Sequence, residues 1–157
     1  MNINTIEDLL KKNSFFGNLP DDDLKLIAGC GSNRVVLEDE VIAREGEEAN
    51  LFYLIRKGKL AIETHMPNKG NSPIQTLGTG DVAGWSWLFP PYRWNFDVRA
   101  LEETHLLCLD GSCLRSKCEA NHSLGYRLIT LFAQLITKRN RALRLQVMDV
   151  YGRSEDS

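Results

Sequence analysis

The stretch Ile42 to Glu63 reads IAREGEEANLFYLIRKGKLAIE, and its pattern decides the fold class. It contains most of three short runs rich in β-forming residues, at 40–44, 51–56 and 59–64. Gly46 and Gly58 separate these runs, in places where a tight turn with positive φ costs glycine little. Short apolar runs divided by glycine turns are typical of strands in an all-β domain. The stretch therefore predicts consecutive strands joined by tight turns.

The same pattern continues outward on both sides of this stretch. Further β-rich runs lie at 34–37, 74–77 and 98–109, and segments rich in glycine, asparagine and proline separate them. MPNKGNSP, from Met66 to Pro73, has the composition of a polar hairpin tip. Many short strands with turn signals between them predict a sandwich, a barrel or a jelly roll.

Helical signals flank the β-rich region. Thr5 to Lys12 and the acidic segment after Pro20 predict two short helices, because each begins with a capping or acidic first turn. From Ser123 to about Val147 the apolar residues step by fours and threes, which predicts one helix of about 37 Å. Either this helix packs only on its own β domain, or part of its apolar stripe pairs with a second copy. We expect the second, a homodimer formed through 123–148.

These elements predict a mainly β protein with flanking helices. The predicted domain organisation is a β domain with N-terminal helices at 1–122, a C-terminal dimer helix at 123–150 and a tail at 151–157. Apolar and charged fractions of 43% and 25% are typical of globular proteins, and a formal charge of −2 favours neither nucleic acid nor membrane. No apolar run approaches the ~20 residues of a membrane span, and the charged N-terminus lacks the apolar core of a signal peptide. We expect a cytoplasmic protein.

The four cysteines are Cys30, Cys108, Cys113 and Cys118. Without a secretory signal, the expected state of all four is a reduced thiol. The C-x4-C-x4-C spacing raises the hypothesis of a metal site. However, two cysteines five residues apart on a helix are about 140° apart and do not share a face. We expect no metal site. The histidines form no H-x-H pair, and no nucleophile–histidine motif is present, so we expect no enzyme.

Three further segments connect these elements to a known family. They are LGTGDVAGW from Leu77, VRALEETHLLCLD from Val98 and MDVYGR from Met148. Together with Ile42 to Glu63, they resemble the cyclic-nucleotide-binding domain of the catabolite activator family of bacterial regulators. The resemblance implies a jelly roll of eight strands with an interior pocket. MDVYGR resembles the junction to that family's DNA-binding domain, and the sequence after it leaves no room for a helix-turn-helix.

The resemblance also implies that Gly80 to Ala100, GDVAGWSWLFPPYRWNFDVRA, is the phosphate-binding segment, called the cassette below. In the family, a short cassette helix presents its N-terminal amides to a cyclic phosphate, as expected for an anion at a helix N-terminus. Here these amides would come from Trp85, Ser86 and Trp87, with the Ser86 hydroxyl as a further donor. All three tryptophans of the chain lie in this segment.

The cassette departs from the family pattern at its two charged positions. Trp85 stands where the family has an acid that holds the ribose hydroxyl. Trp94 and Asn95 stand where the family has an arginine and a small hydroxyl residue. Each lost charged hydrogen bond removes roughly 1.5–3 kcal/mol. At about 1.4 kcal/mol per tenfold, affinity for a standard cyclic nucleotide is expected to fall by roughly two to four decades.

Two interpretations of the altered cassette stay open. Either Arg93 replaces the family arginine and the aromatic side chains stack on a ligand, or Arg93 points to solvent and they fill the pocket. Lys138 and Arg139, on the long helix, either face an anionic ligand or belong to a solvated face. The predicted ligand-binding residues are Gly84, Trp85, Ser86, Trp87, Arg93, Trp94, Asn95, Lys138 and Arg139.

The sequence therefore predicts a regulatory or sensory module that signals through a dimer helix. Its small-molecule effector would be a nucleotide, such as cyclic AMP or cyclic GMP, or another small anion. A protein partner stays open, and we expect neither a DNA-binding domain in this chain nor a membrane. The alternatives are a ligand-free dimerising scaffold whose aromatic cassette plugs the pocket, and an N-terminal fragment of a transcription regulator.

Overall fold

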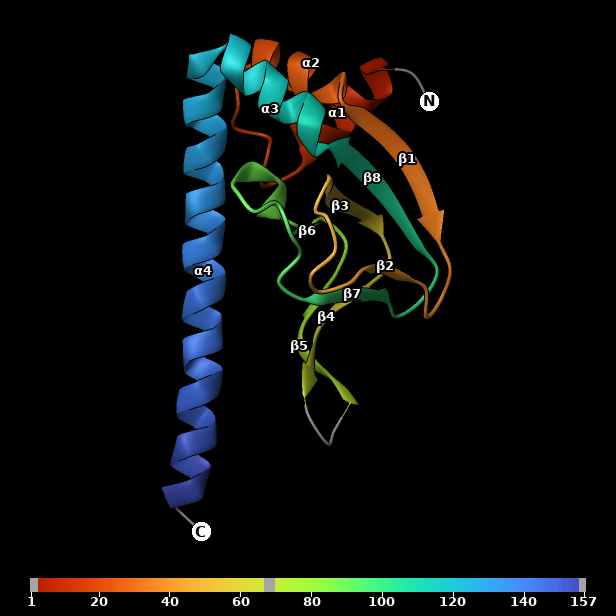
Figure 1. Ribbon diagram of the computed structural model, residues 1–157. Helices are drawn as coiled ribbons and strands as arrows, with labels where there is room; N and C mark the ends of the chain where they lie inside the picture. The colour runs from red at the N-terminus through yellow and green to blue at the C-terminus, as the bar shows by residue number, and fades with distance from the viewer. Residues whose placement is uncertain (1–2, 67–69, 156–157) are drawn as a thin grey trace.

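The computed structural model describes residues 3–66 and 70–155, which form a β domain with helices packed against one side and one long helix beside it (Figure 1). The helical elements are α1 (Ile3–Lys12), α2 (Asp21–Ala28), the single 3₁₀ turn η1 (Ser86–Leu88), α3 (Gly111–Ala120) and α4 (His122–Glu155). The strands are β1 (Gly31–Val36), β2 (Val41–Ala43), β3 (Leu51–Lys57), β4 (Leu60–Met66), β5 (Gly70–Leu77), β6 (Val82–Ala83), β7 (Asp97–Ala100) and β8 (Thr104–Asp110).

The strands form two four-stranded antiparallel sheets, in the orders β1-β8-β3-β6 and β2-β7-β4-β5. This arrangement confirms the predicted jelly roll with flanking helices. The run at 98–109 is two strands, β7 and β8. β6 has only two residues, too few for a pattern to reveal it. The predicted hairpin tip lies partly outside the described residues, and its second half is the start of β5.

Two hydrophobic cores lie on opposite faces of the β1-β8-β3-β6 sheet. Side chains alternate along β3, so Phe52 and Leu54 enter one core while Tyr53 and Ile55 enter the other. The outer core fills the space between this sheet and the helices, and the inner core fills the space between the two sheets. The buried members of the outer core include Leu10, Phe16, Leu24, Trp87, Leu107, Leu128 and Phe132. The buried members of the inner core include Val36, Leu60, Leu77, Trp94, Val98, Leu106 and Cys108.

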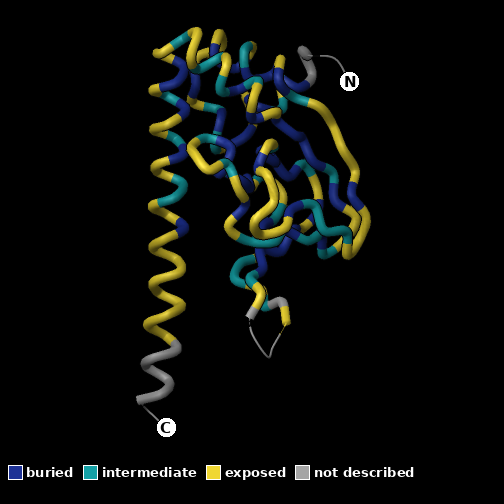
Figure 2. Tube along the Cα trace, viewed as in Figure 1, coloured by how far each residue is buried: buried dark blue, intermediate teal, exposed yellow. Residues whose placement is uncertain are grey.

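Helix α4 packs into the core of the domain along its first half, and in its second half Gln146 donates a 3.5 Å hydrogen bond to the carbonyl oxygen of Ile74 on β5. Leu128 and Phe132 are buried in the outer core, and Arg127 donates two hydrogen bonds to the buried carboxylate of Asp23 on α2. Residues 140–149 are all exposed, and Figure 2 shows this change along the helix. The segment expected to be a tail at 151–157 is helical as far as Glu155. A helix of 34 residues is about 51 Å long. No helix among the described residues has the length and hydropathy of a membrane span.

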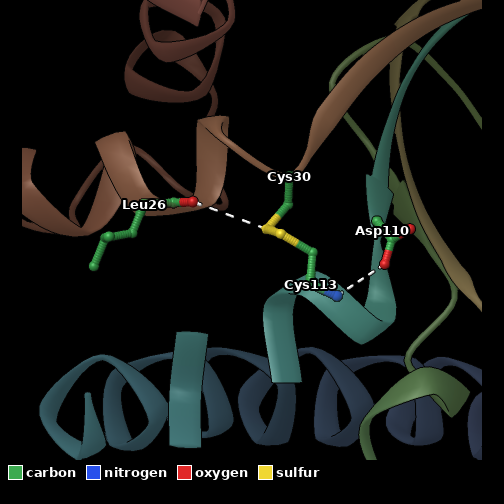
Figure 3. Close-up of a disulfide and its surroundings, with 4 residues drawn as sticks. All are labelled: Leu26, Cys30, Asp110 and Cys113. Carbon is green, nitrogen blue, oxygen red and sulfur yellow. Dashed lines mark hydrogen bonds between the residues drawn. A yellow bond between two sulfur atoms is a disulfide. The ribbon is translucent and has the colours of Figure 1, made fainter. Parts of the chain in front are cut away.

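The expectation of four reduced thiols is wrong for one pair. Cys30, directly after α2, and Cys113, in the first turn of α3, form a disulfide with their Cα atoms 5.6 Å apart (Figure 3). Their sequence separation is 83 residues, and the pairing of β1 with β8 and the packing of α3 beside the end of α2 bring them together. Cys108 is a buried thiol and Cys118 a half-buried one. Spacing along the chain could not reveal this pairing.

Candidate functional site: an aromatic phosphate-binding cassette

After β6 the chain passes through Gly84, a position where only glycine fits. Gly84 has a φ of +96°, which side-chain-bearing residues rarely adopt. A Cβ atom there would lie 2.6 Å from the ring of Trp94 and 3.1 Å from the carbonyl oxygen of Leu51. The sequence analysis predicted Gly84 to be a ligand-binding residue. In the structure it is the indole of Trp94 that approaches the backbone.

The expected cassette helix is a single 3₁₀ turn. It begins after Trp85, whose carbonyl oxygen accepts a hydrogen bond from the amide of Leu88 at 3.1 Å. Ser86 is 4% exposed, so its hydroxyl does not face open solvent. One 3₁₀ turn aligns few peptide dipoles and therefore holds an anion less strongly than a full α-helix would.

Trp87 points away from the predicted pocket and into the outer core. Its ring centroid lies 5.3 Å from that of Phe132 on α4 and 6.5 Å from that of Phe52 on β3. The side chain is fully buried, and its Nε1 atom has no hydrogen-bond partner among the described residues. From α3, Arg115 donates a hydrogen bond to the Trp87 carbonyl oxygen. Trp87 therefore fastens the cassette to the helices.

Trp94 points the other way, into the inner core between the sheets. Its indole stacks on Tyr53 with ring centroids 6.1 Å apart and planes within 16°, and Phe96 meets it edge-on at 5.9 Å. Trp94 is 4% exposed. The same apolar surroundings raise the pKa of Tyr53 to about 12 and that of Cys108 to about 11. An indole therefore occupies the interior in which the resemblance placed a ligand.

The arginines nearest to Trp94 in the sequence are engaged elsewhere. Arg93 is exposed, and its Nη1 donates to the Gly46 carbonyl oxygen at 3.3 Å. Asn95 is exposed as well. On β7, Arg99 makes a two-pronged ion pair with the buried carboxylate of Glu63, with both N–O distances at 3.1 Å. Both guanidinium groups thus donate hydrogen bonds to oxygen atoms of the protein.

Trp85 and Arg139 connect the cassette to α4. The Arg139 guanidinium lies 5.2 Å from the centroid of the half-buried Trp85 ring, and its Nη2 donates to the carbonyl oxygen of Val82 on β6. Arg139 is 7% exposed, and its Nη1 has no hydrogen-bond partner among the described residues. Burial lowers the pKa of Arg139 to about 10, with Asp81 opposing the shift, so the guanidinium stays protonated at neutral pH. The Arg139 guanidinium thus joins α4 to β6 inside the cassette.

A crevice of about 560 Å³ lies between α4, the segment after α1, and β5 with the turn that follows it. Among the residues lining it are Phe15, Gln75, Asp81, Leu135, Lys138 and Arg139. Lys138 is exposed, whereas Arg139 is buried. Of the predicted binding residues, these two therefore meet at the crevice.

The predicted site residues thus fall into four groups. Gly84, Trp85 and Ser86 form the start of the cassette, and Trp94 packs directly on Gly84. Trp87 belongs to the outer core, Arg93 and Asn95 face outward, and Lys138 and Arg139 belong to the crevice. Sequence reasoning missed Tyr53, Phe96 and the Val82 carbonyl. Tyr53 and Phe96 lie at apolar positions that look like ordinary core, and a backbone carbonyl leaves no signal in a sequence.

Comparison with known families agrees with this geometry. The family model described as the cyclic nucleotide-binding domain matches residues 33–121, more than half of the chain. The chain therefore belongs to the cyclic nucleotide-binding domain family, which confirms the resemblance seen in the sequence. This is a family of regulatory binding domains rather than of enzymes.

Particular relatives are found in longer proteins and in a solved structure. A candidate potassium channel protein of Rhodopseudomonas palustris is 31% identical over 142 residues, which are 90% of this chain and 33% of the channel. Human cGMP-dependent protein kinase 2 is 32% identical over 108 residues, which are 65% of this chain and 13% of the kinase. The chain thus spans a third or less of these relatives' length. The crystal structure of a candidate cyclic nucleotide-binding protein from Geobacter metallireducens superposes with a TM-score of 0.77 at 26% identity, covering 85% of this chain and 96% of that one.

Proposed function

We propose that this chain is a regulatory module whose cyclic-nucleotide pocket is closed by its own Trp94, and which acts through α4 rather than by tight binding of cyclic AMP or cyclic GMP. The observation that carries the proposal is the position of the Trp94 indole, stacked on Tyr53 inside the jelly roll and packed on Gly84. A nucleotide in that space would have to displace the indole.

The charges of the cassette support the same proposal. The family's acid is replaced by Trp85, and the family's arginine by Trp94. Arg93 is committed to the Gly46 carbonyl, and Arg99 is committed to Glu63. Each missing charged hydrogen bond lowers affinity, and displacing a buried aromatic ring from a packed core adds a further unfavourable term.

Titration calorimetry with cyclic AMP and cyclic GMP tests the proposal. We expect no binding heat from the wild-type chain at nucleotide concentrations of several hundred micromolar. We expect the double variant Trp85→Glu with Trp94→Arg, which restores both family charges, to gain measurable binding. Asn95→Ala is the matched control, because Asn95 is the exposed neighbour of Trp94. Micromolar binding by the wild type would overturn the proposal.

The output of the module would be α4, paired with α4 of a second copy. Its second half is exposed, yet it carries Leu143, Leu145, Val147 and Met148, all exposed apolar residues. Leu145 and Met148, three residues apart, share one face of the helix, and exposed apolar residues of this kind are typical of a helix that packs against another helix. Sedimentation equilibrium should show a dimer for the wild type and a monomer for Leu145→Glu with Met148→Glu. A monomeric wild-type chain would contradict the pairing.

The crevice favours a second candidate function, the sensing of a small anion. Lys138 and Arg139 line it, and the guanidinium has one N–H without a partner among the described residues. Asp81, also in the lining, opposes an anion, but its carboxylate already accepts a hydrogen bond from the Gly78 amide at 2.8 Å. Thermal shift with inorganic phosphate and with small dicarboxylates tests this candidate. Stabilisation that Lys138→Ala abolishes would support it, and no shift from any of these anions would reject it.

A further inference from the structure

The disulfide lies at the end of the β1–β8 ladder, where Gly31 pairs with Leu109 and the Cys30 carbonyl oxygen accepts a hydrogen bond from the Asp110 amide at 2.9 Å. Cys30 lies between α2 and β1, and Cys113 lies three residues into α3. Figure 3 shows the bond bridging the end of α2 and the first turn of α3, with the Asp110 carboxylate accepting a hydrogen bond from the Cys113 amide at 2.8 Å. The covalent bond therefore adds to the backbone hydrogen bonds that place the start of α3 relative to the N-terminal helices.

Small residues surround the disulfide and leave it open to solvent. The hollow at this point is lined by Gly29, Gly31, Ser32, Asp110, Ser112 and Ser116, together with the two cysteines. Cys30 is 7% exposed and Cys113 is half-buried. A small thiol can therefore approach one sulfur atom without unfolding the chain. A disulfide that borders a solvent-filled hollow in this way exchanges with thiols more readily than a fully enclosed one.

We propose that Cys30 and Cys113 form a reversible thiol–disulfide exchange site, which takes a dithiol reductant and sets how firmly α3 holds the cassette. In the reaction, a thiolate of the reductant attacks one sulfur of the disulfide and forms a mixed disulfide, releasing the other cysteine as a thiolate that takes up a proton. The second thiol of the reductant then displaces the remaining cysteine. Two electrons and two protons pass to the protein, and the reductant leaves as its own disulfide.

The first turns of α3 are in direct contact with the cassette. A Cβ atom on Gly111 would lie 2.6 Å from the Cβ atom of Trp87, so helix and cassette touch there at backbone distance. Four residues on, Arg115 donates to the Trp87 carbonyl oxygen, and its guanidinium lies 4.4 Å from the centroid of the Tyr92 ring. Any change in the placement of the start of α3 therefore reaches η1 and the loop after it.

The other two cysteines differ from this pair. Cys108 is 4% exposed in the inner core, where burial raises the pKa of its thiol to about 11 and keeps it protonated. Cys118 lies five residues after Cys113 on α3, about 140° around the helix. Burial raises the pKa of Cys118 as well. These thiols serve as internal references for the exchange reaction. The inference goes beyond the proposed function and does not depend on whether the pocket is closed.

The experiment is a redox titration of the purified chain with reduced and oxidised dithiothreitol. Alkylation under denaturing conditions followed by mass spectrometry should count two free thiols in the oxidised chain and four in the reduced chain, with full return on reoxidation. Native hydrogen exchange should show amides of Ser86–Leu88 and of the first turn of α3 exchanging at least tenfold faster after reduction. Cys118→Ser is the matched control: it should gain two thiols on reduction as the wild type does, from one to three, and should show the same hydrogen exchange.

Three results would each overturn the proposal. The first is a count of four thiols in excess oxidised dithiothreitol, because no disulfide would then form. The second is a disulfide that dithiothreitol reduces only after the chain is unfolded by denaturant. The third is reduction that leaves the exchange of η1 unchanged, because the bond would then be uncoupled from the cassette. Cys30→Ser should match the reduced state, and the wild-type titration decides the matter if that variant does not fold.

Discussion

Trp87 and Trp94 lie seven residues apart in one loop, are both almost fully buried, and enter different cores. Trp87 packs on Phe132 between sheet and helices, where a domain of this family needs filling whatever it binds. Trp94 stacks on Tyr53 between the sheets, in the interior where the resemblance to the family implies a ligand pocket. Burial alone therefore does not distinguish a structural indole from one that occupies a binding site. The two are distinguished by the location of the cavity that removal of the ring would leave.

The largest effect should come from the outer core. Trp87→Ala should lower the free energy of unfolding by about 3–5 kcal/mol, because a large cavity would open among Phe52, Phe132 and the helices. Urea denaturation measures this change in the free energy of unfolding. Trp87→Phe is the control and should cost much less, since it keeps an aromatic ring and removes the unpartnered indole N–H. If Trp87→Ala cost under 1 kcal/mol, the cassette would not depend on the outer core.

A smaller effect is expected in the inner core. Trp94→Ala should lower the free energy of unfolding by about 2–4 kcal/mol, less than Trp87→Ala, because the exposed neighbours Arg93 and Asn95 leave the new cavity close to solvent. The same urea experiment gives the comparison directly. A cost larger than that of Trp87→Ala would show that Trp94 is ordinary core, and the contrast between the two tryptophans would collapse.

Alkaline pH should weaken the inner core selectively. The pKa of Tyr53 rises from 10.0 to about 12 on folding and that of Cys108 from 9.0 to about 11, in both cases mainly through burial. The unfolded chain loses these protons first, so stability is complete below pH 9 and falls as pH rises toward 12. Each group should account for about 3 kcal/mol of the loss once the pH exceeds its pKa in the folded chain. Urea denaturation at pH 8, 10 and 11 tests this, and Tyr53→Phe should flatten the fall above pH 10.

The smallest effect on stability should come from the link between α4 and the cassette. Arg139→Met should change the free energy of unfolding by about 1 kcal/mol or less, because it loses a hydrogen bond to Val82 but also removes a buried charge. Hydrogen exchange should nevertheless quicken in β6 and in α4 around residue 139. Lys138→Met, at the exposed neighbouring position, should leave both unchanged. Equal exchange in the two variants would mean that Arg139 does not hold the helix to the strand.

Much of the fold could be predicted because glycines and short β-rich runs are local signals. Gly46 and Gly58 have the positive φ angles that the turn pattern implies, and the runs around them became β2, β3 and β4. The site was less predictable. Which core a tryptophan enters depends on its direction from an irregular loop, which has no periodicity. The pairing of Cys30 with Cys113 and the bond from Arg139 to Val82 join residues far apart in sequence, and a single chain carries no signal for such contacts.

The part of α4 beyond Arg139 would amplify small tilts of the helix. Arg139 is the last buried residue of α4 among those whose burial is described, and the helix continues to Glu155. Sixteen residues at 1.5 Å each put the far end of α4 about 24 Å beyond that attachment. A tilt of roughly 10° at Arg139 would then displace the end by about 4 Å, close to one helical turn. Motions too small to open the jelly roll could therefore still shift the register at which a neighbouring helix packs.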